Sequence, residues 1–230
     1  MSKSIAEIKK EFEDLVIKMP ENLLAVIGLP LVIQNKLYNC AAIIRKNEVL
    51  GVQVKTYLPS YNEFYETRWF SSAKELPPQT TIEFLGKQIP VSNDILVEDR
   101  TTGARIGVEI CEDLWVPIPV STNLALAGAN ILCNCSASNE GIAKEAYRRD
   151  LVNHQSACTF SGYIYASAGP SESTSDLVFS NHNMIVENGK LLAETTLKEK
   201  KKFIISEIDL AHLRNDRIHF KTSYEEYRNC

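Results

Sequence analysis

A cysteine and a lysine each stand directly after an apolar run, where a strand would end. Cys111 follows "RIGVEI" at residues 105–110, and Lys55 follows "EVLGVQV" at residues 48–54. A thiol that closes a strand can be exposed at the edge of a sheet, where the next backbone N–H can bind an oxyanion. The competing interpretations are a small core residue for Cys111 and a surface lysine for Lys55.

Two carboxylates, Glu112 and Asp113, follow the cysteine at once. Neighbouring negative charge disfavours a thiolate, so a nucleophile at this place needs a cation or a general base close by. Lys55 is the best cation, because two residues at strand ends on the same edge of a sheet can face one pocket. None of the histidines has a partner at motif spacing, so we do not predict a Cys–His dyad.

Composition sets the class of protein. The chain has 230 residues, 44% of them hydrophobic, which is enough for one sizeable domain with a core. The net charge of −4 gives no reason to expect nucleic acid or a membrane as a partner. There is no signal-peptide core and no apolar run of transmembrane length, so we expect a cytoplasmic protein. The six cysteines form no C-x-x-C pair, so we expect free thiols and no zinc site.

The elements that would hold Cys111 and Lys55 mix hairpins with strand–helix–strand units, which needs a mixed sheet with helices on a face. Spacing predicts helices at 5–17, 121–129 (capped by Ser121), 142–161 (ended by Gly162) and 210–216. It predicts strands at 23–29, 38–45, 48–54, 82–84, 88–91, 95–98, 105–110, 131–135, 163–168, 183–187, 190–194 and 203–208. Pro30 is expected to begin a turn, residues 198–202 to form a solvated turn, and residues 221–230 to form an exit tail.

Three segments carry a family resemblance, which covers residues 24–216. They are "VKTYLPSYNEFYETRWF", "GVEICEDLWVPIP" and "YRRDLVNHQSACTFSGYIYASAGPSESTSDLVFSNHNMIVENGKLLAET". Together they resemble the nitrilase superfamily, and more narrowly the glutaminase domains of glutamine-dependent NAD synthetases. The resemblance implies an α/β fold, a nitrilase-like α-β-β-α sandwich with mixed sheets, formed by residues 1–230 as a single domain.

The resemblance also implies a Glu–Lys–Cys triad. Cys111 corresponds to the nucleophile, which attacks the carboxamide of glutamine and forms a thioester while ammonia leaves. Lys55 corresponds to the cation beside the developing oxyanion. Glu66 corresponds to a supporting glutamate that orients Lys55 or the general base, although spacing alone equally allows a salt bridge to Arg68.

Four further positions correspond to substrate contacts in the family. Tyr61 would line the pocket wall, Glu112 would bind the α-ammonium of glutamine, and Ser138 would be a hydrogen-bond donor. Lys144 stands where the family places an arginine near the substrate carboxylate; it supplies the charge without the bidentate fork.

The sequence departs from the family at both ends. The family's general base is a glutamate after an early strand, whereas the glutamates before Lys55 lie on the first predicted helix, after a proline or at a hairpin turn. We therefore expect a chain that lacks the first strands of the complete domain and the C-terminal synthetase domain. No cofactor is expected in this domain, because ATP and magnesium belong to the synthetase domain. Unpaired sheet edges would favour association with another chain, so a homo-oligomer is expected.

Three functions stay open at this point. The first is a glutamine amidohydrolase that supplies ammonia to a synthetase domain making NAD from deamido-NAD. The second is another carbon–nitrogen hydrolase, acting on a different amide or a nitrile. The third is a non-catalytic remnant or assembly subunit, which the missing glutamate favours. Cys133 and Cys135 are expected to be buried small side chains rather than a redox pair, and "AGPSESTSD" a loop rather than a phosphate-binding motif.

Overall fold

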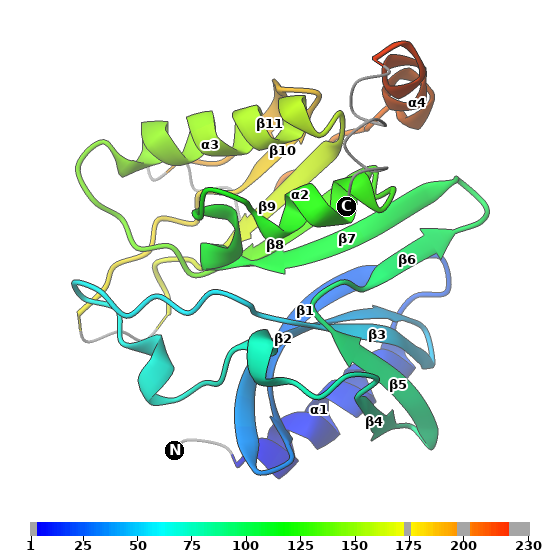
Figure 1. The fold of residues 1–230 in the computed structure, drawn as a ribbon, viewed down its shortest axis with the longest axis vertical. Helices are drawn as coiled ribbons and strands as arrows, with labels where there is room; N and C mark the ends of the chain where they lie inside the picture. Colours follow the sequence, from blue (N-terminus) through cyan, green and yellow to red (C-terminus); the bar gives the residue numbers. More distant parts are fainter. Residues whose placement is uncertain (1–3, 173–175, 197–202, 221–230) are drawn as a thin grey trace. The chain divides into compact units, whose positions relative to one another are not determined.

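The computed structural model describes residues 4–172, 176–196 and 203–220. Its contacts separate into two compact units, Met1–Val97 and Glu98–Cys230. Each unit contains its own sheet, and each sheet combines parallel with antiparallel strand pairs (Figure 1). The predicted mixed α/β class is therefore confirmed. The predicted turn at 198–202 and the predicted tail at 221–230 lie outside the described residues.

The first unit is built on a five-stranded sheet in the order β1-β2-β3-β5-β4. Its elements are α1 (Ile5–Lys18), β1 (Ala25–Ile33), β2 (Lys36–Arg45), β3 (Glu48–Val54), the 3₁₀ turns η1 (Glu66–Arg68) and η2 (Ala73–Glu75), β4 (Thr81–Phe84) and β5 (Lys87–Ser92). The β3–β5 pair is parallel, and the other neighbours are antiparallel. The β2–β3 and β4–β5 hairpins form where short polar turns separate apolar runs, as the sequence predicts.

Helix α1 closes the core of this unit. Ser4 caps it by accepting a hydrogen bond from the backbone N–H of Glu7 at 3.3 Å. Phe12 and Val16, one helical turn apart, are buried, and the Phe12 ring lies 5.3 Å from the Phe84 ring on β4. The helix predicted at 5–17 is thus confirmed, and Phe12 and Val16 form its buried face.

The predicted turn at Pro30 is wrong, because β1 continues through the proline to Ile33. Pro30 pairs with Asn39 of β2, and the chain reverses only at Gln34 and Asn35. β1 is an edge strand, so a residue without a backbone N–H can be accommodated there at little cost.

The second unit carries a six-stranded sheet in the order β11-β10-β9-β8-β7-β6. Its elements are β6 (Leu96–Asp99, which begins at the end of the first unit), β7 (Ala104–Ile110), the 3₁₀ turn η3 (Cys111–Leu114), α2 (Val120–Leu126), β8 (Ile131–Ser136), α3 (Lys144–Cys158), β9 (Gly162–Ser167), β10 (Met184–Glu187), β11 (Lys190–Glu194) and α4 (Leu210–His219). β7, β8 and β9 are parallel, so their carboxyl ends share one edge of the sheet.

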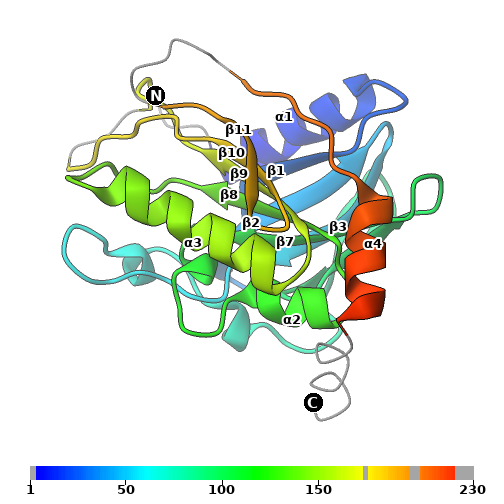
Figure 2. The same cartoon turned by 90° about the horizontal axis from the view of Figure 1, so that it is seen from above.

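Two helices cover one face of this sheet. Figures 1 and 2 show α2 and α3 side by side there, with α2 packed on β7 and α3 on β9 and β10. Leu124 of α2 and Val152 of α3 are buried. Gly107 of β7 lies under α2, where an added Cβ would approach the Leu124 side chain to 3.1 Å. The glycine therefore allows the helix to pack closely on the strand.

Three predicted features of the second unit are wrong. Ser121 does not cap α2: the N-cap is Pro119, and Ser121 is fully buried as the second residue of the helix. The third helix spans Lys144–Cys158 rather than 142–161, and Gly162 begins β9 instead of ending the helix. Residues 203–208, all of them described, form no strand. Their alternation is real, since Phe203 and Ile205 are exposed and Ile208 lies against Gly162, but alternation does not supply a neighbouring strand.

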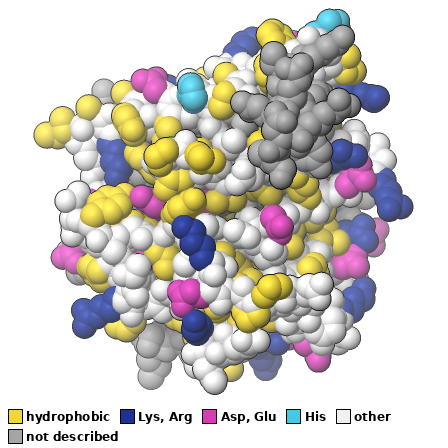
Figure 3. Space-filling model, in the orientation of Figure 1, with side chains coloured by type: hydrophobic (Ala, Val, Ile, Leu, Met, Phe, Trp, Pro, Cys, Tyr) yellow, Lys and Arg dark blue, Asp and Glu magenta, His cyan; other side chains and the backbone are white. Residues whose placement is uncertain are grey.

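Two observations, on surface charge and on the helices, concern a possible contact with membranes. Acidic and basic side chains are interspersed over the face drawn in Figure 3, without one sign gathering into a large area. None of the helices in the described ranges combines the length and the apolar character needed to cross a bilayer.

Candidate functional site

Cys111 ends β7 in a left-handed backbone conformation. Its φ is +48°, a region that residues other than glycine seldom adopt, and it opens η3 immediately. The chain therefore turns sharply at the cysteine, as a nucleophile elbow requires. The side chain is half-buried rather than enclosed in the core.

Neighbouring side chains hold this turn through the backbone. The Cys111 N–H donates to Oδ1 of Asn134 on β8 at 3.0 Å, and the Ile110 N–H donates to Oδ2 of Asp113 at 3.1 Å. Asp113 is fully buried, so one of the two carboxylates that follow the cysteine serves the turn itself. Glu112 is half-buried, and its carbonyl accepts from the Trp115 N–H at 2.9 Å.

The other described cysteines lie in less reactive places. All five described cysteines are free thiols, including Cys133 and Cys135, which form no disulfide. Burial raises the pKa of the Cys40 and Cys133 thiols to about 12 and that of Cys135 to about 11. Burial also raises the pKa of Cys158, the exposed thiol at the end of α3. Such thiols are poor nucleophiles near neutral pH.

In the first unit, Lys55 and Glu66 form a buried ion pair. Lys55 directly follows β3, and its side chain is 3% exposed against 15% for Glu66. Glu66 Oε2 accepts from Lys55 Nζ, while Glu66 Oε1 accepts from Asn39 Nδ2 at 2.8 Å. Spacing allowed Glu66 to pair with either Lys55 or Arg68, and its carboxylate contacts Lys55. The Arg68 guanidinium lies 5.4 Å from the Trp69 ring. A cation this buried needs the fixed carboxylate beside it.

Backbone contacts fix Lys55 as well. Its N–H donates to the Asn39 carbonyl at 2.9 Å, and its own carbonyl accepts from the Ala73 N–H at 3.0 Å. Tyr61 belongs to the loop between Lys55 and Glu66. It is 50% exposed, and its ring lies edge-on to Phe64 with centroids 5.8 Å apart.

In the second unit, Ser138 and Lys144 flank the segment between β8 and α3. Ser138 is 3% exposed, and its Oγ lies 3.4 Å from Nη2 of Arg148. Lys144 begins α3, donates to Oδ1 of Asn139, and lies 5.4 Å from the ring of Trp115. The lysine predicted to meet a substrate carboxylate is thus held beside an aromatic face and an amide.

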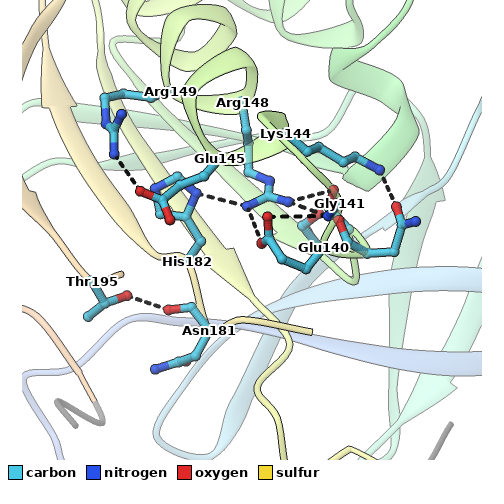
Figure 4. A network of polar contacts seen from close by, with 12 residues as sticks. Glu140, Gly141, Lys144, Glu145, Arg148, Arg149, Asn181, His182 and Thr195 are labelled. Atoms are coloured by element: carbon cyan, nitrogen blue, oxygen red, sulfur yellow. Dashed lines mark hydrogen bonds and ion pairs between the residues drawn. The ribbon is translucent and has the colours of Figure 1, made fainter. Parts of the chain in front are cut away.

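Arg148 lies behind this segment and is completely buried (Figure 4). Its Nη2 donates to the Asn139 carbonyl at 3.0 Å, and its Nη1 donates to His182 Nδ1 at 2.8 Å. Nη1 also lies 3.4 Å from Oε2 of Glu140. The guanidinium therefore ties residues 138–140 to the segment that precedes β10.

These contacts define the state of His182. Since Nδ1 accepts from Arg148, the imidazole is neutral and its Nε2–H donates to Oε1 of Glu194 at 2.7 Å. Burial lowers the pKa of His182, and the nearby Arg148 charge lowers it further. Burial alone would raise the pKa of Glu194, but hydrogen bonds from Arg149 and His182 outweigh it and lower that pKa.

Sequence reasoning missed the residues that support the predicted ones. Asn39, Asn134 and Arg148 went unnoticed, as did Glu109, a buried glutamate within β7. The signal was available: a carboxylate inside "IGVEI" and an amide inside "ILCNC" are polar groups in strands that are otherwise apolar. Such groups are retained where partners satisfy them.

The predicted residues divide between the two units. Lys55, Tyr61 and Glu66 belong to Met1–Val97, whereas Cys111, Glu112, Ser138 and Lys144 belong to Glu98–Cys230. Within the units, Lys55 is brought to Glu66, and Cys111 is set in its turn next to Glu112. A shared site for Lys55 and Cys111 stays a prediction.

Comparisons with known proteins identify the family of this chain. Residues 16–218 match the family described as carbon-nitrogen hydrolase. A glutamine-dependent NAD(+) synthetase from Mycobacterium tuberculosis is 38% identical over 206 residues, which are 89% of this chain and 30% of that protein. The chain thus spans about a third of the length of the curated relatives it matches.

Solved structures give the same relationship. The crystal structure of a glutamine-dependent NAD(+) synthetase from Cytophaga hutchinsonii superposes with a TM-score of 0.70 and 28% identity, over 84% of this chain and 31% of that one. A carbon-nitrogen hydrolase from Helicobacter pylori superposes with a TM-score of 0.70 at 20% identity, over 94% and 71% of the two chains, which shows a shared fold. With a family match over most of its length, this chain belongs to the carbon–nitrogen hydrolase family.

Proposed function

We propose that this chain is the glutamine-hydrolysing part of an NAD synthetase. The observation that carries the proposal is the strained turn at Cys111, which is set at the carboxyl end of a parallel strand as a nucleophile must be. The identity to glutamine-dependent NAD(+) synthetases supports glutamine as the substrate.

The reaction is a two-step acyl transfer. The Cys111 sulfur attacks the side-chain carbonyl carbon of glutamine, the thiol proton passes to the departing nitrogen, and the carbon–nitrogen bond breaks, so that ammonia leaves and a glutamyl thioester remains. Water then hydrolyses the thioester, which releases glutamate and restores the thiol. In this mechanism the Lys55 ammonium, held by Glu66, stabilises the oxyanion that develops on the carbonyl oxygen, a contact of the kind that contributes about 3 kcal/mol.

The remaining predicted residues bind the substrate. Glu112 offers an anion for the α-ammonium group, and Ser138 a hydroxyl donor. Lys144 offers a cation for the α-carboxylate, and Tyr61 forms a wall of the pocket. The ammonia is then used by an ATP- and magnesium-dependent synthetase domain that converts deamido-NAD to NAD, either joined to this domain or bound to it.

A trapping experiment tests the proposal. The protein is incubated with glutamine, ammonia release is measured, and an acid-quenched sample is analysed by peptide mass spectrometry for a glutamyl thioester. We expect the adduct on Cys111 and loss of ammonia release in Cys111→Ala. Cys158→Ala is the matched control, because Cys158 is an exposed free thiol of the same unit, and it should retain the activity.

Two results contradict the proposal in different ways. An adduct that forms with other amides or nitriles but not with glutamine would make the chain a different carbon–nitrogen hydrolase. An unreactive Cys111 with every amide, in the presence of the synthetase domain as well, would make it a non-catalytic subunit.

A further inference from the structure

A chain of buried polar side chains crosses β7, β8 and β9 beneath Cys111. Glu109 and Asn134 are each 1% exposed, and Tyr163 is completely buried. They lie on three adjacent parallel strands, with Glu109 and Asn134 directly opposite each other in the register. Polar groups so deep in a sheet are costly unless each one is satisfied, so their arrangement calls for a function.

The hydrogen bonds run in one direction along this chain. Asn134 Nδ2 can only donate, and it donates to the Tyr163 hydroxyl oxygen at 3.2 Å. The Tyr163 hydroxyl in turn donates to Oε1 of Glu109, and Oε2 of Glu109 accepts from the Ser121 N–H at 2.8 Å. Because its amide nitrogen faces Tyr163, Asn134 must turn its oxygen toward the Cys111 N–H, which it accepts at 3.0 Å.

The protonation of the chain agrees with this direction. Burial raises the pKa of the Tyr163 phenol well above its usual value, and the adjacent Glu109 raises it further, so the hydroxyl keeps the proton that it donates. Burial also raises the pKa of Glu109, whereas the hydrogen bonds from Tyr163 and Ser121 act in the opposite sense.

We propose that Asn134 and Tyr163, anchored by Glu109, are positioning residues that hold the Cys111 backbone in its left-handed conformation and so present the thiol for attack. A non-glycine residue at this φ is strained, and it persists only where its surroundings fix it. Asn134 fixes the N–H of the strained residue itself, from a strand that is hydrogen-bonded to β7 on one side and to β9 on the other. The proposal deepens the proposed function, on which its catalytic readout rests.

The geometric readout needs no catalysis. In Tyr163→Phe the Asn134 amide nitrogen loses the hydroxyl acceptor and keeps only the Glu109 carboxylate as a partner, so the bond to the Cys111 N–H weakens. We expect hydrogen exchange of the peptide that contains residues 110–115 to rise about tenfold, the effect of one lost hydrogen bond. We also expect iodoacetamide to alkylate Cys111 about tenfold more slowly, with the exposed Cys158 as the internal standard.

The controls separate positioning from general loss of stability. Tyr38→Phe removes a hydroxyl from an equally buried tyrosine of the first unit and should change neither readout. Glu109→Gln keeps an acceptor for the Ser121 N–H and leaves the Tyr163 oxygen for Asn134. Its rates of hydrogen exchange and of Cys111 alkylation should therefore stay within about threefold of those of the native protein. Glu109→Leu removes the acceptor of both the Ser121 N–H and the Tyr163 hydroxyl, so Tyr163 is no longer anchored and the variant should resemble Tyr163→Phe.

The catalytic readout is a split between kcat and KM. For glutamine hydrolysis, Tyr163→Phe should lower kcat about tenfold and leave KM unchanged, because the substrate-binding side chains are untouched. Unchanged exchange and alkylation in Tyr163→Phe would overturn the positioning role, whatever the enzyme's substrate. Slowed alkylation together with an absence of glutaminase activity in the native protein would instead overturn the proposed function and leave the positioning role standing.

Discussion

The buried guanidinium of Arg148 gives the sharpest prediction about stability. The Arg148→Met variant fills the site with a long apolar side chain and lacks the donors that join residues 138–140 to His182 (Figure 4). The Asn139 carbonyl and the His182 ring nitrogen Nδ1 then lose the guanidinium that donates to them in the native protein.

The contacts set the size of the effect. The two short hydrogen bonds, to His182 Nδ1 at 2.8 Å and to the Asn139 carbonyl at 3.0 Å, involve a charged donor and are each worth about 1.5–3 kcal/mol. The two contacts at 3.4 Å, to Glu140 and Ser138, add little. Against this, Arg148 carries a buried charge whose Nε has no partner, and removing it recovers part of that cost. We therefore expect a net loss of about 3 kcal/mol.

Tryptophan fluorescence can follow the second unit alone. The chain has two tryptophans, so Trp69→Phe leaves Trp115, which stacks on Tyr147, as the reporter. Urea unfolding in this background should show the loss as a lower midpoint at unchanged slope, and the melting temperature should fall by about 6–12 °C.

Arg149→Met is the matched control for this measurement. The neighbouring arginine is 29% exposed and pairs with Glu145 and Glu194, so its removal should cost about 1 kcal/mol or less. A loss below about 1 kcal/mol for Arg148→Met, or a loss equal to that of Arg149→Met, would refute the reasoning that burial makes these hydrogen bonds strong.

Three further predictions concern other charged groups. Burial lowers the folded-state pKa of His182 below its usual 6.5, so near and below that pH the folded state binds fewer protons than the unfolded state. The free energy of unfolding should therefore decrease as pH falls below about 6.5. Urea midpoints at pH 5 and 7.5 should differ less in His182→Gln than in the native protein. Glu66→Gln leaves the Lys55 ammonium buried beside a neutral partner, so we expect a loss of about 3 kcal/mol in urea unfolding, and a loss below 1 kcal/mol would show that the pair is dispensable. The Arg217 guanidinium donates to the carbonyls of residues 129, 159 and 160 at 2.5–2.9 Å, so Arg217→Leu should cost about 2 kcal/mol, whereas Arg214→Leu on the exposed side of α4 should be neutral.

Much of the fold could be predicted because local patterns determine it. The β2–β3 and β10–β11 hairpins follow from polar two-residue turns between apolar runs, at residues 46–47 and 188–189. The failures share a cause, since they depend on neighbours that a local pattern does not contain. Pro30 is compatible with a strand only because that strand lies at an edge, and residues 203–208 alternate without a partner strand.

The candidate site shows the same division. Lys55 and Cys111 could be located because each directly follows an apolar run, and the sharp turn at Cys111 could be anticipated from that position at the end of a strand. What the sequence left open was which carboxylate would meet which cation. Arg68 is two residues from Glu66 and Lys55 is eleven, yet the fold pairs Glu66 with Lys55. Sequence distance does not rank partners when a loop returns to the end of a strand.

The two predicted reactive residues are supported by the same kind of construction, although they belong to different units. Each follows the last residue of a strand, and each lies near an asparagine of the adjacent strand and a carboxylate of a 3₁₀ turn. For Lys55 these groups are Asn39 and Glu66, and for Cys111 they are Asn134 and Asp113. The two asparagines act differently, because the Asn39 amide donates to the carboxylate that binds Lys55, whereas the Asn134 amide accepts from the Cys111 N–H and donates to Tyr163. An asparagine within an apolar strand, next to a strand that ends in Lys or Cys, is therefore a better indicator of a supported reactive residue than the charge pattern around that residue.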